Sequence, residues 1–363
     1  MTVLWILLVP IIWLFIAKYI FRTTFNWKEF GISVAIVSIF TIGAWQISKF
    51  SQTIDFEIWN GYITNKKRVH DSYVETYECN CYTTCSGSGN SQVCTQHCSI
   101  CTEDHYTVKW YAESTVGEIQ FKYRDSTSKS VYNEPDPPAY KNCKIGEPAA
   151  QEYRYTNYIR AVPESLFNDN GTTASEQFVG KIPPYPRVYN FYKVRRVLNI
   201  GATIPKNAID KINDGLSNEL KTLGTMKQAN IIVILTSISD PSYRYAVEQA
   251  WLGGKKNDIV VFVGLNQNKI IWSDVMTWAL NSGNELFQVT LRDEIMKQKV
   301  LDPDKFVSLV SNTVLKLYDR PQMKDYEYLA DEVKPPLWVV LILVILAFGG
   351  SAILTYIFHK HEI

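Results

Sequence analysis

Three long apolar segments dominate the pattern of hydrophobic and polar positions along the chain. Residues 2–20, 31–47 and 337–358 contain Lys18 as their only charged side chain. A helix of about 20 apolar residues is long enough to cross a bilayer. The pattern therefore predicts three transmembrane helices, two within residues 1–50 and one near the carboxyl terminus.

The first two segments each have an alternative interpretation. Segment 2–20 could be a cleaved signal peptide, but Met1, Thr2 and Val3 lack the basic residues of such a peptide and no small-residue cleavage site follows. Segment 31–47 could be a buried hairpin helix, but its position directly after another apolar segment favours a second crossing. We expect both helices to be retained and to span the membrane.

The distribution of basic residues predicts the orientation. Lys18, Arg22 and Lys28 lie at or within the connection between the first two segments, whereas no Lys or Arg precedes the first. Because cytoplasmic loops carry an excess of Lys and Arg, we expect this connection in the cytoplasm, together with the tail 359–363. Residues 51–334 are then expected on the outer side of the membrane.

Alternating polar and apolar residues follow the second apolar segment. Residues 54–63, 106–110 and 118–123 show this period of two, which is typical of half-buried strands. Residues 182–186 contain three prolines and are expected to link to the next domain. The sequence therefore predicts a β-rich module over residues 51–195.

This module contains all seven cysteines of the chain. Six lie within residues 79–101, on either side of a Ser- and Gly-rich tip at 86–91, and the seventh follows much later. They are Cys79, Cys81, Cys85, Cys94, Cys98, Cys101 and Cys143. The flanking runs 74–79 and 102–108 are expected to pair as a β-hairpin that carries the six clustered cysteines.

Disulfides, a zinc site and free thiols are the alternatives for this cluster. On the outer side, oxidation would form disulfides, each stabilising by about 2–4 kcal/mol a tip that has no hydrophobic core. Thiolates with His97 or His105 could instead hold a tetrahedral zinc ion. Only Cys98 and Cys101 have zinc-ribbon spacing, so we favour disulfides. Six cysteines can pair in fifteen ways, and the sequence selects none of them; Cys143 is left over.

A different pattern begins near residue 197. The run 231–235, and the run 258–263 after its first residue Asp258, are continuously apolar, as in strands that are buried on both faces. Asp240 and Pro241 are expected to open a helix between them, which Gly253 and Gly254 would end. This unit predicts two parallel strands joined by a right-handed crossover.

The flanking residues extend this unit. Residues 197–201 are expected to form an entry strand, and apolar positions at helical spacing over 209–223 predict a long amphipathic helix. Residues 269–272 are expected to return as an antiparallel edge strand. Further helices are predicted around Leu291 and after Asp302.

These elements resemble a known family. A strand that ends in a short polar loop, a helix that closes in Trp251, Gly254 and Lys255, and an Asp-led apolar strand are similar to the TPM domain family over residues 197–318. The resemblance implies a small α/β sandwich located outside the membrane of bacteria or in plastids. Some members of that family are described as acid phosphatases or metal binders, and others as assembly factors.

The expected fold class is therefore α/β, a TPM-like αβα sandwich over residues 196–320, with a Cys-rich β module and three transmembrane helices. Residues 321–336 are expected to tether the sandwich to the last helix. Chains with this combination look like membrane proteins of bacteria or of their phages. The resemblance thus implies a bacterial inner membrane, with residues 51–334 in the periplasm.

Polar residues at the ends of the two buried runs are the candidate ligand-binding residues. Ligands of open α/β sheets bind beyond the carboxyl ends of the strands, where Ser237, Ser239, Asp240 and Asn266 lie in this sequence. Asp240 could help hold a hydrated Ca²⁺ or Mg²⁺, and the helix start could bind phosphate; helix capping alone also accounts for Asp240. Asp293 is the second candidate metal ligand.

The sequence favours binding over catalysis. Residues 204–334 contain no His, the commonest general base, and residues 201–203 lack the Asp that metal-binding members of the family share there. Lys and Arg total 37 against 36 Asp and Glu, which gives no basic field for nucleic acid. We expect a membrane-anchored scaffold that contacts another envelope or membrane protein, with a metal-dependent phosphatase of TPM type as the alternative.

Overall fold

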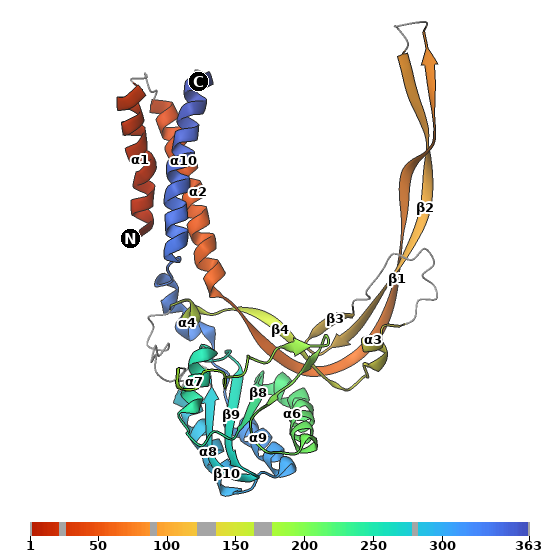
Figure 1. Ribbon diagram of the computed structural model, residues 1–363, viewed down its shortest axis with the longest axis vertical. Coiled ribbons are helices and arrows are strands. Elements are labelled where there is room, and N and C mark those ends of the chain that lie inside the picture. Colours follow the sequence, from red (N-terminus) through yellow and green to blue (C-terminus); the bar gives the residue numbers. More distant parts are fainter. Residues whose placement is uncertain are drawn as a thin grey trace.

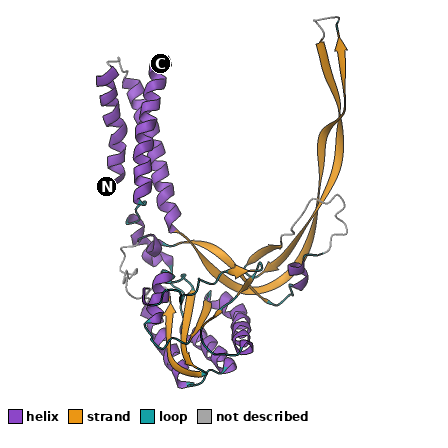
Figure 2. Ribbon diagram, viewed as in Figure 1, coloured by secondary structure: helices purple, strands orange, loops and turns teal. Residues whose placement is uncertain are grey.

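The protein consists of a helical bundle, a β module with a long hairpin, and an α/β domain (Figure 1). The structure is a computed structural model, and it describes residues 2–21, 27–87, 93–121, 136–162, 176–277 and 282–361. Figure 2 shows the strands of the β module running from the base of the bundle, past the α/β domain with its own sheet, into the long hairpin.

The bundle contains α1 (Thr2–Phe21), α2 (Trp27–Thr53) and α10 (Leu337–His361). The helices pack through apolar side chains that include Ile6, Val37 and Leu343. Two of them, over Lys28–Thr53 and Leu337–Phe358, are long and apolar enough to cross a membrane, whereas the apolar stretch of α1, Trp5–Tyr19, is shorter. The second apolar segment is thus part of a longer helix than the sequence predicted.

The ends of the bundle are arranged as the orientation prediction requires. The end of α1, the start of α2 and the end of α10 lie at one end of the bundle, away from the α/β domain (Figure 1). At the other end, Nε2 of Gln52 donates to the carbonyl oxygen of Lys334 at 2.9 Å, which ties the exit of α2 to the entry of α10. The connection at 22–26 lies outside the described residues.

The β module is a four-stranded antiparallel sheet with the order β3-β2-β1-β4. Its strands are β1 (Ile54–Ser86), β2 (Val93–Ser114), β3 (Gly117–Phe121) and β4 (Pro148–Thr156). Two of the strands that alternation predicted lie within β1 and β2, and residues 118–121 of the third lie within β3, whereas its last two residues lie outside the described residues. Short elements flank the sheet: α3 (Pro138–Asn142), α4 (Tyr158–Ala161), β5 (Val188–Tyr189) and β6 (Lys193–Val194). Trp110, Phe121 and Tyr192 are among the residues of its hydrophobic core.

Beyond this sheet, β1 and β2 continue as a two-stranded ribbon. β4 pairs with β1 only over 54–62, and β3 pairs with β2 only over 110–114. Among the described residues, 69–86 and 93–109 therefore pair only with each other, and we call them the arm. The pairing of 74–79 with 99–104 confirms the predicted hairpin. Most of the predicted Ser- and Gly-rich tip, residues 88–91, lies outside the described residues.

The α/β domain is built on a sheet with the order β10-β9-β8-β7. The strands are β7 (Val197–Ile200), β8 (Asn230–Thr236), β9 (Asp258–Asn266) and β10 (Lys269–Thr277). Its helices are α6 (Lys206–Lys227), α7 (Tyr243–Ala250), α8 (Ser282–Lys297) and α9 (Pro303–Leu317). β7, β8 and β9 are parallel and β10 is antiparallel, which confirms the predicted parallel pair and antiparallel edge.

Helices cover both faces of this sheet. Apolar residues of α6, α8 and α9 pack on one face, and those of α7 pack on the other with Phe178 and Trp251. β7, β8 and β9 follow one another in one direction across the sheet, so two right-handed crossovers would put α6 and α7 on the same face. Because the two helices lie on opposite faces, one of these crossovers is left-handed, against the general rule that the prediction used.

Three local expectations differ from the structure. The helix after β8 begins at Tyr243, two residues later than an Asp240 cap implies, because residues 240–242 form a turn. The expected linker 182–186 is packed on the α/β domain, where the carbonyl oxygen of Pro183 accepts from Nε1 of Trp251 at 2.9 Å. The expected tether contains a 3₁₀ helix, η3 (Met323–Asp331), which packs on α4.

Candidate functional site

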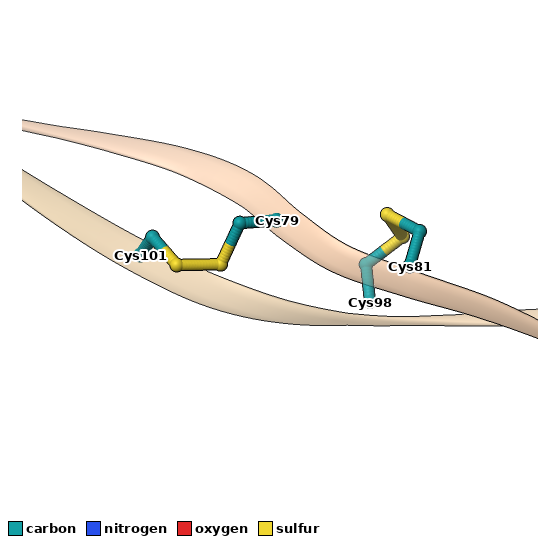
Figure 3. The surroundings of a disulfide bond; sticks show 4 residues. All are labelled: Cys79, Cys81, Cys98 and Cys101. Carbon is teal, nitrogen blue, oxygen red and sulfur yellow. A yellow bond between two sulfur atoms is a disulfide. The ribbon is translucent and has the colours of Figure 1, made fainter.

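The clustered cysteines form three nested disulfides along the arm. Cys79 joins Cys101, Cys81 joins Cys98 and Cys85 joins Cys94, with Cα atoms 5.7, 4.0 and 4.0 Å apart. Figure 3 shows the first two bonds between the paired strands. The antiparallel register selects this pairing, because it brings residues that are equally far from the tip into contact. The predicted disulfides are confirmed.

The disulfides also decide what the cluster can bind. Among the described residues, the one group of three potential metal ligands close together is Glu78, Cys81 and Cys98. A metal needs thiolate sulfur, and the sulfurs of Cys81 and Cys98 are bonded to each other. The oxidised arm therefore offers no cysteine ligand set at this group.

Cys143, the leftover cysteine, lies in the core of the β module rather than in the arm. It is 2% exposed and free. Burial raises the pKa of its thiol, although the nearby Tyr192 hydroxyl opposes this. A buried thiol of this kind is a poor nucleophile, so Cys143 fits a packing role.

The surface of the arm is acidic and carries exposed apolar groups. Residues 69–108 contain five acidic side chains and no Lys or Arg. Large side chains along the arm are also open to solvent: Tyr73, Val74, Tyr77, Tyr82 and Ile100, the last 76% exposed. The arm has no hydrophobic core that could cover them, because it is only two strands wide.

At the strand ends of the α/β domain, the predicted ligand-binding residues lie on the surface close to the indole of Trp272. Ser237, Ser239 and Asn266 are exposed at this edge of the sheet. The indole of Trp272 lies over Gly264 in the adjacent strand, and its Nε1 donates to the carbonyl oxygen of Ile238 at 2.8 Å. The indole thus fills the space above the ends of β8 and β9.

The two predicted metal ligands have other partners. Oδ1 of Asp240 accepts from the backbone amide of Ser242 at 2.9 Å, and this hydrogen bond lowers the pKa of Asp240. Asp293 accepts from Arg292 at 2.9 Å. Asp240 precedes α7 and Asp293 lies on α8, and these helices cover opposite faces of the sheet. The fold does not bring the two carboxylates into one site.

Instead, the structure joins the β module to the α/β domain through buried charges. Asp55 at the start of β1 is 1% exposed, and its Oδ1 accepts from Nζ of Lys255 at 2.6 Å and from Arg160 at 2.9 Å. Its Oδ2 accepts from Nδ2 of Asn157 at 2.9 Å. Burial by itself raises the pKa of Asp55, but Lys255 and Asn157 outweigh this, and the pKa lies below its usual value.

Asp258 is the second buried carboxylate of this junction. It accepts from the Tyr185 hydroxyl at 2.9 Å, from Nδ2 of Asn230 at 2.8 Å and from the backbone amide of Lys255 at 2.7 Å. Burial raises the pKa of Asp258 to about 6, although these hydrogen bonds oppose the rise. Asp55 and Asp258 thus differ because only Asp55 contacts cationic side chains directly.

A third buried contact links Glu57 to the end of the α/β domain. Glu57 is 2% exposed and accepts from Arg320, and Nε1 of Trp59 donates to the same carboxylate at 2.8 Å. Nζ of Lys256 lies 3.9 Å away. The β module and the α/β domain therefore meet through buried ion pairs at Asp55 and Glu57.

Sequence reasoning missed this junction. Asp55 and Glu57 occupy polar positions of an alternating strand, and such positions usually face solvent. In the sequence, Lys255 and Asp258 were considered only as part of the pattern that resembles the TPM family. The one available signal was the charge of Asp258 directly before a strand that is buried on both faces, because a charge there needs a partner.

Comparison of the chain with protein-family models, with curated proteins and with solved structures finds no match. The resemblance to the TPM family therefore remains a prediction from the sequence, and the function has to be argued from the molecule itself.

Proposed function

We propose that this chain is an integral membrane protein with three membrane spans whose arm binds a partner protein on the outer side of the membrane. In this proposal the membrane is a bacterial inner membrane, residues 51–334 lie in the periplasm, and the partner is another envelope or membrane protein. The observation that carries the proposal is the disulfide-linked arm, which projects from the folded domains and exposes apolar groups.

The outward faces of the bundle support the membrane part of the proposal. Ile39 on α2 is 72% exposed and Ile345 on α10 is 69% exposed. Exposed apolar surface of this extent marks contact with a membrane or a protein. A core helix of a soluble protein would bury these side chains, so lipid accounts better for them. α1 packs on both other helices and completes the bundle.

The construction of the arm supports the binding part. A two-stranded ribbon is only marginally stable in water, because it has no hydrophobic core. The three disulfides therefore keep the surface of the arm in a single conformation. Tyrosine side chains give large contact area at low conformational-entropy cost, and Tyr73, Tyr77 and Tyr82 are all exposed on the arm. A rigid surface loses little entropy when it binds.

The charge of the arm indicates the surface charge of the partner protein. Because residues 69–108 are acidic and lack Lys and Arg, they are repelled by the anionic head groups of lipids and attracted by a basic protein surface. The arm runs in the same direction as the helices of the bundle (Figure 1). Its carboxylates cannot share the depth of the hydrocarbon core. In the membrane the arm therefore leans away from the bundle, toward the aqueous side.

Photo-crosslinking in the native membrane tests this proposal. A crosslinking residue at Ile100 is expected to give a discrete adduct with another protein, which weakens at high salt and disappears in a Cys81→Ser, Cys98→Ser variant. The matched control is Ile145, which is 64% exposed but lies outside the arm. The proposal fails if Ile100 gives no adduct, or if both positions give the same one.

The phosphatase alternative has less support. A metal-dependent phosphatase would need Asp240 and Asp293 to share an ion, and these residues belong to helices on opposite faces of the sheet. Phosphate-ester turnover by the full chain that depends on a divalent cation and is lost in Asp240→Ala would restore this alternative.

A further inference from the structure

Arg196 is a buried cation that has no carboxylate partner among the described residues. Its guanidinium donates to the amide oxygens of Asn230, at 2.6 Å, and of Asn60, and the side chain is 3% exposed. Its Nε has no hydrogen-bond partner in the described part of the chain. A buried charge without a counter-charge is costly, and an unpaired buried donor of this kind indicates a missing water or ligand.

Arg196 is linked to the carboxylate of Asp258 only through a neutral side chain. Asn230 accepts from Arg196 and donates to Asp258 at 2.8 Å, so one amide separates the two charges. Burial lowers the pKa of Arg196 to about 10, even though Asp258 and Tyr185 oppose this. The guanidinium is charged at neutral pH and only partly compensated.

Arg196 lines a cavity of about 230 Å³ at the junction of the β module and α6. The cavity is far larger than the space of about 10–15 Å³ that one water needs and smaller than most pockets for drug-sized ligands. Besides Tyr192 and two acidic residues, the polar and basic side chains that line it are Arg196, Lys193, Asn60, Asn213, Ser217 and Tyr189. Domain junctions are common places for ligand sites.

We infer that this cavity binds a small molecule through a single carboxylate or phosphate group, which pairs with Arg196 and Lys193. A guanidinium is well suited to such oxyanions because it donates along two parallel directions. Lys193 is half-buried, lines the same cavity and adds a second positive charge, and the hydroxyl of Tyr189 can donate to a remaining oxygen. The hydroxyl of Ser217 donates to the carbonyl oxygen of Asn213 at 2.7 Å and contributes only to the wall of the cavity.

Two acidic residues of the cavity limit the charge of the ligand. Glu147 accepts from the hydroxyl of Tyr192 and stays on that side of the cavity. Asp214 is exposed at the rim. Both repel further negative charge, so the site favours one oxyanion group over a polyanion.

Calorimetric titration of the full chain in detergent tests the inference, with acetate and with inorganic phosphate as probes and chloride to hold the ionic strength constant. At least one probe is expected to bind saturably, and the stronger one identifies the group. Lys193→Gln and Arg196→Lys are each expected to weaken this binding about tenfold or more, as loss of a charged hydrogen bond implies. Ser217→Ala is expected to weaken it less.

Arg195→Gln is the matched control, because it removes the same charge from the neighbouring, exposed residue that does not line the cavity. It is expected to leave the affinity within about twofold. If Arg196→Lys fails to fold, Lys193→Gln still tests the site. The inference is wrong if neither probe binds saturably, which would mean that water fills the cavity, or if Lys193→Gln binds as tightly as Arg195→Gln.

Discussion

Asp55 and Asp258 lie in the same junction, but folding lowers the pKa of Asp55 and raises the pKa of Asp258. Lys255 and Arg160 contact Asp55 and stabilise its charge, whereas Asp258 is buried and held by neutral donors. The folded state therefore gains stability from the charge of Asp55 and loses stability to the charge of Asp258. At the residue scale, the pH dependence of the protein follows from this difference.

The first prediction concerns Asp258. Its pKa rises from 3.8 to about 6 on folding, so between these values the folded state binds more protons than the unfolded state. The contribution of Asp258 to the free energy of unfolding then falls as pH rises from about 4 to 6. The stability gap between the wild type and Asp258→Asn should narrow over this range in thermal unfolding of the full chain. A gap that stays constant or widens would contradict the assignment.

The second prediction concerns Asp55, whose pKa is lowered on folding. Its contribution is complete above pH 3.8 and is lost as pH falls further. Asp55→Asn leaves Lys255 without its ionic partner and is expected to lower the free energy of unfolding at pH 7 by about 3–5 kcal/mol. The control is Asp71→Asn, whose pair with Lys109 is exposed and screened by solvent, so its loss should change the free energy of unfolding much less. Equal effects of the two substitutions would show that Asp55 is not buried.

At the scale of elements, the arm depends on its disulfides and the α/β domain does not. The arm is two strands wide, whereas α6 and the sheet of the α/β domain share a core of fully buried residues such as Leu216 and Val233. Reduction should therefore loosen one element and leave the other folded. A second feature of the elements is the contact between α6 and β1, which requires the close packing at Gly224.

The third prediction follows from the nested disulfides. Without reductant, the denatured chain should show one titratable thiol, that of Cys143, and after reduction it should show seven. Each disulfide is expected to stabilise the arm by about 2–4 kcal/mol, so reduction should expose residues 69–109 to proteolysis while the α/β domain stays protected. Mass spectrometry of the fragments provides the measurement. Cleavage spread evenly over the chain would be the opposite result.

The fourth prediction concerns Gly224 on α6. A Cβ at this position would overlap the backbone carbonyl of Asn60 on β1. Gly224→Ala should therefore push α6 away from β1 and lower the free energy of unfolding by about 1–3 kcal/mol, although alanine is the better helix former. Gly31→Ala on α2 is the matched control, because its Cβ would meet open space. Thermal unfolding that ranks Gly224→Ala equal to this control would refute the contact.

At the scale of the whole molecule, a bundle with apolar outer faces and an acidic arm belong to the same chain. Lipid can cover Ile39 and Ile345, but the carboxylates of residues 69–108 require water. The two parts therefore cannot lie at the same depth, even though they run in the same direction (Figure 1). Among the described residues, the sheet narrows to two strands after the pair of Arg68 and Trp110. The register shift between Ile63 and Asn65 lies just before this point, and the arm is most easily bent there.

The fifth prediction tests this arrangement with spin labels on the full chain in nanodiscs. A label at Ile345 should be relaxed by oxygen, which dissolves in lipid, and a label at Ile100 by a water-soluble nickel chelate. A label at Phe15 on α1, which is 60% exposed, should behave like the one at Ile345 if all three helices span the bilayer. Nickel access at Phe15 would limit the bundle to two spans, and oxygen access at Ile100 would place the arm in lipid.

The sequence by itself determined the type of most elements. Apolar length predicted the helices of the bundle, a period of two predicted the strands of the β module, and continuous apolar runs predicted the parallel strands β8 and β9. These patterns are local, because each follows from which side of one helix or strand is buried. The cluster of cysteines likewise predicted disulfides.

Only the tertiary structure decided the pairing and the sites. The disulfide pairing required the hairpin register, and the position of the indole of Trp272 above Gly264 required β10 to pair with β9. The junction joins residues as distant as Asp55 and Lys255, which are 200 positions apart, and the cavity at Arg196 lies between parts that are also far apart in the chain. The burial of such a charge depends on which distant elements meet, and a local pattern of polar and apolar residues contains no information about that.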